Sequence, residues 1–345
     1  MKLQSLFALL ILGVSCSTVR AQVLKDLRVK PDSVISENKQ ENVSLKNIRP
    51  IVPKLELEVD YWKHWTSFGV NINQAAFNDN WKGGGVGSTA VGLIANHKSD
   101  YTRDNFNFVT EIDLRYGKIK NKNQIAKKNN DRIFWDNKLS YKLSTKWALY
   151  TSLTFESQFD DGFKYKPVNG RDTIFYIENA FMAPAYITES LGLEYKPSPS
   201  YSIRFGTGTA RQTLILDNRV KPRSAEDYFR EFGKYLDPDK PENGTGERFG
   251  IKEGEDFKND LAFQITGNMD KNFTDKLNVK ARYNLFANYK KLNDPSHRLD
   301  VTVTAKVSRA INVNLNGIMV YDSDVISRVQ LSESLALGLV YKLPR

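Results

Sequence analysis

From about Trp65 to its C-terminus, the chain alternates apolar and polar residues in successive segments. One segment reads, from position 311, Ile-Asn-Val-Asn-Leu-Asn, which does not match the helical period of about 3.6 residues. A period of two places alternate side chains on opposite faces of a strand. Such strands, joined by connections that are in turn short and long, are typical of a transmembrane β-barrel, where every second side chain faces lipid.

We therefore predict an all-β protein, an up-and-down antiparallel transmembrane β-barrel of about twelve strands. The predicted strands are 66–76, 87–97, 104–117, 132–142, 147–160, 185–196, 200–213, 258–269, 276–290, 297–307, 311–322 and 329–342. The connections after even strands are short, whereas those after odd strands include long ones at 118–131, 161–184 and 214–257. This asymmetry predicts short turns in the periplasm and long loops outside the cell.

Aromatic residues lie near both ends of the predicted strands. One group lies beside the short turns: Tyr141, Trp147, Tyr195, Tyr201 and Tyr341. Amphipathic rings collect at the level of the lipid headgroups, so this group predicts a periplasmic aromatic girdle. A secreted soluble β-sandwich is the alternative, because 40% hydrophobic and 26% charged residues suit both folds. The predicted strands are about twice the usual globular length, which favours the barrel.

The N-terminus has an early lysine, an apolar run and a small-x-small cleavage pattern that ends before Gln22. We predict a signal peptide at 1–21, a poorly ordered periplasmic leader at 22–60 and the barrel at 61–345. The only cysteine, Cys16, lies inside the signal, so the mature chain has no disulfide. The predicted location is the outer membrane, reached through a cleaved signal peptide.

The same alternation predicts which side chains line the lumen. The charged residues expected to point inward are Glu111, Asp113, Arg115, Asp136, Lys138, Glu156, Glu194, Arg204, Lys280, Arg282 and Lys306. Buried charges are usually paired, so this set predicts either an ion-pair network that braces the barrel or the lining of a selective channel. Basic residues slightly outnumber acidic ones in this set, so any conductance should favour anions.

The connection at 214–257 contains a short helical pattern. Ser224 followed by Asp227 resembles a capping box. Phe229, Phe232 and Leu236 recur at helical spacing, which predicts a short amphipathic helix inside a long external loop. These three apolar residues either form a lid over the pore or pack on its rim.

The connection at 118–131 is rich in lysine. It predicts either a solvated loop or a basic patch that contacts lipopolysaccharide head groups. Outer-membrane lipid and lipopolysaccharide are thus the predicted partners. Export excludes nucleic acid as a partner, and the sequence does not identify a protein partner.

No motif predicts catalytic chemistry. The histidines His64, His97 and His297 form no local pair with serine, and no Cys/His/Asp cluster has metal-ligand spacing. The expectation is a protein that is not an enzyme, with no catalytic residue, cofactor or metal. The alternative is a lipid-acting outer-membrane enzyme of phospholipase type, in which a serine, a histidine and a polar partner would converge at the outer rim.

Three parts of the sequence resemble a known family: Phe68 to Trp81, Phe181 to Pro197 and Phe249 to Gly254. Together they resemble the Bacteroidetes outer-membrane family catalogued as domain of unknown function 3078. The resemblance spans most of residues 60–345 and implies secretion and a barrel. It implies no catalytic residues, because that family has no established activity. The predicted function is a narrow channel or a structural or accessory envelope protein.

Overall fold

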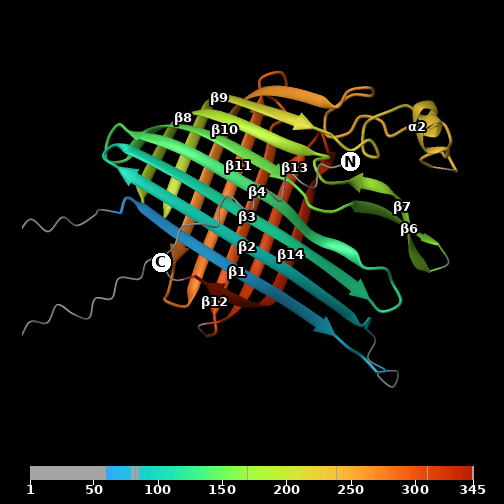
Figure 1. Ribbon diagram of the computed structural model, residues 1–345, viewed down its shortest axis with the longest axis horizontal. Helices are drawn as coiled ribbons and strands as arrows, with labels where there is room; N and C mark the ends of the chain where they lie inside the picture. Colours follow the sequence, from blue (N-terminus) through green and yellow to red (C-terminus); the bar gives the residue numbers. More distant parts are fainter. Residues whose placement is uncertain are drawn as a thin grey trace, which may run out of the picture. The chain divides into compact units, whose positions relative to one another are not determined.

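The computed structural model describes residues 60–78, 82, 85–168, 170–237, 239–308 and 310–343. The predicted signal peptide and all but the last residue of the predicted leader lie outside these residues. Twelve antiparallel strands close into a barrel in the order β1-β14-β13-β12-β11-β10-β9-β8-β5-β4-β3-β2 (Figure 1). The fold class predicted from the alternation is confirmed.

Each of the twelve predicted strands is present, with ends that differ by a few residues. The barrel strands are β1 (Trp62–Ala75), β2 (Ser88–Arg103), β3 (Phe106–Asn121), β4 (Lys127–Lys142), β5 (Trp147–Ser157), β8 (Ala185–Ser198), β9 (Tyr201–Leu214), β10 (Phe257–Asn272), β11 (Leu277–Asn288), β12 (Ser296–Lys306), β13 (Ile311–Asp322) and β14 (Ile326–Lys342). The ladder between β1 and β14 closes the barrel, so no barrel strand has an unpaired edge.

Two of the predicted long loops differ from the structure. Much of 118–131 is strand, because β3 and β4 continue past the expected ends and pair with each other through a bulge near Gly117. The connection between β5 and β8 contains a hairpin, β6 (Gly162–Val168) and β7 (Arg171–Asn179), which the sequence reading missed. In β7 the apolar residues are consecutive rather than alternating, from Ile174 to Ile177, and Ile177 packs against the buried core of this connection.

The β9–β10 connection contains the predicted helix, α2 (Ala225–Phe232). The Ser224 side chain caps it by accepting a hydrogen bond from the Asp227 backbone N–H at 3.2 Å. Gly233, at φ 67°, ends it in the left-handed conformation that glycine adopts without strain. No helix in the described part of the chain is long and apolar enough to cross a membrane.

The two long connections pack together into what we call the external cap, the described residues of 158–184 and 215–256. Its core consists of five fully buried apolar residues: Ala180, Ala183, Ile215, Val220 and Ile251. Arg219 joins the two connections through its ion pair with Asp161, at 2.8 Å. The cap is therefore an ordered structure with its own small core.

The barrel wall is apolar on the outside. Leucines that alternate along the strands have exposed outward side chains, such as Leu193 at 42%, Leu335 at 60% and Leu337 at 56%. Aromatic pairs lie at the end with the short turns, where the rings of Trp147 and Tyr195 are 4.8 Å apart. An exposed apolar wall with aromatic residues near one end is the pattern of a barrel solvated by lipid.

The arrangement of the connections predicts the orientation of the barrel in the membrane. We expect a membrane-impermeant maleimide to label Lys240→Cys, in the external cap, on intact cells, and to leave Ser144→Cys, in the β4–β5 turn, unlabelled until the cells are lysed. Mass spectrometry of the labelled protein measures this, and wild-type protein controls for Cys16. Labelling of Ser144→Cys alone on intact cells would reverse the orientation.

Candidate functional site

The strand register places the predicted lumen residues on one face of the wall. Lys98 lies opposite Glu111, and Glu111 lies opposite Asp136 on the next strand. Following the ladders around the closed barrel places the same face of every strand inward. This face carries the predicted set Glu111, Asp113, Arg115, Asp136, Lys138, Glu156, Glu194, Arg204, Lys280, Arg282 and Lys306.

Several of these charges form a connected network in the lumen. The Lys138 ammonium lies 2.6 Å from a Glu194 carboxylate oxygen, and both side chains are almost fully buried. Arg204 lies 3.6 Å from Glu194 and 3.4 Å from Asp136. Asp136, 4% exposed, also lies 3.4 Å from Arg282 of β11. Each of these charges depends on its partner, because loss of one partner would leave the other charge buried and unpaired, at a large cost in folding free energy.

A second set of ion pairs crosses the lumen from wall to wall. Arg298 of β12 lies 3.2 Å from Glu156 of β5, and Arg132 of β4 lies 3.9 Å from Asp300 of β12. In the closed strand order, five strands separate β4 from β12 on either side, so these two strands face each other. Side chains from opposite walls therefore meet within the lumen at this level.

An aromatic ring lies within this crossing network. Phe134, 5% exposed, has the guanidinium groups of Arg132 and Arg282 at 4.4 and 4.8 Å from its ring. The sequence reading missed Arg132, Phe134, Arg298 and Asp300. Their positions share the inward register of residues that it did select, so the same alternation could have found all four.

The network leaves out some predicted lumen residues. Lys280 pairs with Asp270 on the neighbouring strand at 3.4 Å, and both side chains are more than half exposed. Arg115 pairs with Asp113 of its own strand at 2.7 Å. These pairs do not cross the lumen.

The predicted lid residues make contacts inside the external cap. Phe232 packs against Tyr228, the buried residue of α2, with ring centroids 4.7 Å apart. Phe229 is 44% exposed and lies 4.6 Å from the ring of Tyr235. Leu236 is half-buried beyond the helix. Closure of the pore by these residues stays a prediction.

Several lysines of the predicted basic patch bind acids. Lys118 lies 3.0 Å from Asp160 of the cap, and Lys128 lies 2.8 Å from Asp131. Asp160 accepts a hydrogen bond from the Tyr116 hydroxyl, which is the largest cause of its lowered pKa. A second hydrogen bond, from Lys118, acts in the same direction, and the pKa of Asp160 falls to about 2. The ionised Asp160 carboxylate therefore stabilises the folded protein at any pH above the pKa that Asp160 has in the unfolded chain. This stabilisation is lost as the pH falls toward 2. Contact of the patch with lipopolysaccharide stays a prediction.

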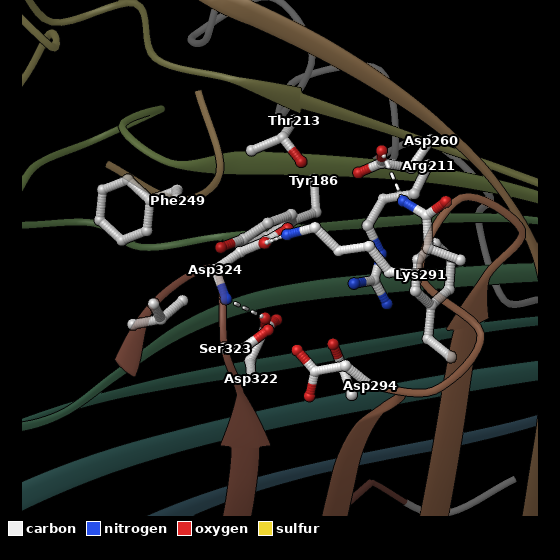
Figure 2. Close-up of a pocket in the computed structure, with 14 residues that line it drawn as sticks. Tyr186, Arg211, Thr213, Phe249, Asp260, Lys291, Asp294, Asp322, Ser323 and Asp324 are labelled. Atoms are coloured by element: carbon white, nitrogen blue, oxygen red, sulfur yellow. Dashed lines mark hydrogen bonds and ion pairs between the residues drawn. The ribbon is translucent and has the colours of Figure 1, made fainter. Parts of the chain in front are cut away.

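A pocket opens at the mouth of the barrel beside Phe249 (Figure 2). Its walls come from β8 to β13, the β13–β14 turn and Phe249 of the external cap, around a space of about 460 Å³ that includes open solvent. The Asp324 carboxylate accepts hydrogen bonds from Lys258 at 2.6 Å and Lys291 at 3.0 Å. Burial opposes ionisation of Asp324, but these hydrogen bonds outweigh it and lower the pKa.

A serine lies between two histidines on the outside of the wall. The Ser99 hydroxyl is 2.8 Å from His64 Nδ1 and 2.8 Å from His97 Nε2, and Thr66 Oγ1 is 2.7 Å from His97 Nδ1. The sequence reading missed this cluster, which forms only when β1 and β2 pair. It lies at the end with the short turns and Ser99 is 5% exposed, so it does not match the outer-rim arrangement that a lipid-acting enzyme was expected to have.

Closure, an apolar outer wall and a charged lumen together define a class of protein, the transmembrane β-barrel of the outer-membrane type. Residues 72–163 match the model of the family described as Protein of unknown function (DUF3078). This match supports the predicted resemblance over those residues, whereas a Bacteroidetes origin stays a prediction. No curated protein has a significantly similar sequence.

Solved outer-membrane barrels are similar to this chain at low sequence identity. The translocator domain of the autotransporter NalP from Neisseria meningitidis is 9% identical, with coverage of 83% of this chain and 90% of that domain and a TM-score of 0.34. The beta domain of the Bordetella autotransporter BrkA is 10% identical, with coverage of 82% and 99% and a TM-score of 0.31. The COG4313 outer membrane channel from Pseudomonas putida F1 is 10% identical, with coverage of 82% and 97% and a TM-score of 0.34.

Proposed function

We propose that this chain is an outer-membrane barrel with a closed lumen, which serves the envelope as a structural or accessory protein and does not conduct solutes at rest. The observation that carries this proposal is the contact between Arg298 and Glu156, at 3.2 Å, from strands on different sides of the lumen. The Asp136 to Arg282 contact, at 3.4 Å, adds a second connection between β4 and β11.

Paired charges suit a closed lumen better than a selective channel. A conducting filter needs sites that bind an ion and then release it. In this lumen the carboxylates of Asp136, Glu156 and Glu194 already lie beside arginine or lysine, as in the 2.6 Å contact between Lys138 and Glu194. A permeating ion would have to displace these partners while they remain buried.

Conductance in planar lipid bilayers tests the proposal. We expect wild-type protein to give small or no conductance steps, and Glu156→Ala/Arg298→Ala to give larger ones, because it removes both members of a pair that crosses the lumen. Asp270→Ala/Lys280→Ala is the matched control, since it removes a pair of the same charge between neighbouring strands. The control should behave as wild type.

The opposite outcome is equally clear. Large steps from wild-type protein, unchanged in the Glu156→Ala/Arg298→Ala variant, would show that the ion pairs do not close the lumen. That result would favour a channel over a closed structural or accessory barrel. Circular dichroism should verify the β structure of each preparation before its conductance is compared.

Export through a signal peptide cleaved before Gln22 would deliver the chain to the outer membrane. The apolar wall supports a membrane location, with exposed leucines such as Leu335 and Leu337 on its outer face. Lipid is then the solvent of the wall, and lipopolysaccharide a candidate contact of the external lysines.

A further inference from the structure

The end of the barrel with the short turns carries a group of exposed lysines. Each lies in a short turn or within two residues of the end of a strand beside one. We call them the basic rim: Lys142, Lys146, Lys196, Lys276 and Lys306. Within the described residues, no carboxylate lies at ion-pair distance from any of the five.

The acids at this end are engaged elsewhere. Asp104 and Asp270 each pair with another cation, at 3.8 and 3.4 Å. Glu194 attracts Lys196, but the buried network described above already holds this carboxylate at 2.6 Å. Two further acids lie directly opposite lysines in the ladders, Asp100 opposite Lys63 and Glu111 opposite Lys98. Asp275 alone, in the β10–β11 turn, has no such cation among the described residues, so the basic rim keeps a surplus of positive charge.

Four of the five lysines face each other in two pairs. The Lys196 backbone N–H donates to the Lys146 carbonyl at 2.8 Å, and the Lys306 N–H donates to the Lys276 carbonyl at 2.7 Å. Each bond extends a strand ladder by one step, so the two side chains of each pair lie opposite each other. Like charges in this arrangement destabilise a sheet. An anion between the two ammonium groups would offset the repulsion.

The register directs the basic rim toward the mouth of the lumen. Lys306 has the inward register, and Lys196 follows Glu194 by two residues on the same face. Between the two lysine pairs lie β9 and β10, which places β8 and β11 roughly 15 Å apart along the wall. One small anion cannot contact both pairs at that separation. A polymer with repeated negative charges can.

We propose that the basic rim binds peptidoglycan through the free carboxylates of its stem peptides. The short turns are expected to face the periplasm, where peptidoglycan is an acidic polymer with carboxylates at regular intervals. Several weak contacts on one polymer act together, so exposed lysines that are weak ligands singly can hold it. This partner goes beyond the closed-lumen function and does not depend on it.

Cosedimentation with insoluble peptidoglycan sacculi tests the proposal, with the full chain folded in detergent micelles. At low salt we expect wild-type protein to pellet with the sacculi, and sodium chloride to release it, because salt screens contacts between exposed charges. Sacculi whose carboxylates have been amidated should bind about tenfold more weakly or worse. No pelleting at low salt, or equal pelleting with amidated sacculi, would overturn the proposal. Binding of poly-L-glutamate without binding of sacculi would also overturn it, in favour of an acidic protein segment.

Variants locate the contact. Lys196→Gln/Lys306→Gln removes one lysine from each pair and should weaken binding about tenfold or more. It should fold as wild type, because it also relieves the repulsion within each pair. Lys164→Gln/Lys234→Gln is the matched control, since it removes two exposed lysines from the external cap, and it should bind as wild type. The heat-dependent gel shift of a folded barrel verifies folding. Unchanged binding by folded Lys196→Gln/Lys306→Gln would contradict the assignment.

Discussion

Leu335→Arg should destabilise the folded barrel by about 2–4 kcal/mol in a lipid bilayer. Leu335 lies near the middle of β14, and its side chain is 60% exposed on the outer wall. An arginine there would enter the hydrocarbon region, where its charge has no water and no partner. Urea unfolding in bilayers, followed by tryptophan fluorescence, measures the change.

The adjacent position provides the matched control. Ser334 pairs opposite Asn316 and therefore faces the lumen, where it is exposed. Ser334→Arg adds the same side chain to the same strand but directs it away from lipid, so its effect should be much smaller. Equal losses of stability from the two variants would show that the assigned register of β14 is wrong.

Asp136→Asn should cost about 3–5 kcal/mol of folding free energy, because it removes one partner of a buried network and leaves the others uncompensated. The Asp136 carboxylate lies 3.4 Å from both Arg204 and Arg282 and accepts a hydrogen bond from Thr154 at 2.9 Å. Asparagine keeps the size of the side chain but removes the charge. The same urea titration gives the difference in stability.

Asp270→Asn is the control for that measurement. Asp270 also pairs with a cation, Lys280 at 3.4 Å, but the two side chains are 57% and 59% exposed. Water already solvates such a pair, so its loss should change stability by about 1 kcal/mol or less. If Asp136→Asn proves as mild as Asp270→Asn, the lumen network is hydrated and contributes little to folding.

Much of the fold follows from the sequence because a strand has a simple period. One face of each strand contacts lipid and the other faces the lumen. The alternation of apolar and polar residues within a single strand therefore predicts which side chains point inward. The residues from Ile311 to Asn316 were assigned in this way, and the register between β13 and β14 agrees with that assignment. Local rules also predicted α2, since Ser224 caps it through contacts three residues away.

The sequence was less informative where structure depends on distant residues or on water-exposed strands. In the β6–β7 hairpin the alternation is confined to Phe163 to Lys166 of β6. Its surroundings become buried only when Ala180 and Ala183 meet Ile215 and Ile251. Similarly, Ser99 meets His64 only through the pairing of β1 with β2.

The sequence by itself determined the strands, the inward and outward faces and the difference between the two ends of the barrel, because all three depend on neighbours along the chain. Only the tertiary structure decided which charges meet. Glu156 and Arg298 are far apart in sequence, and their 3.2 Å contact exists because closure of the barrel brings β5 and β12 within reach across the lumen.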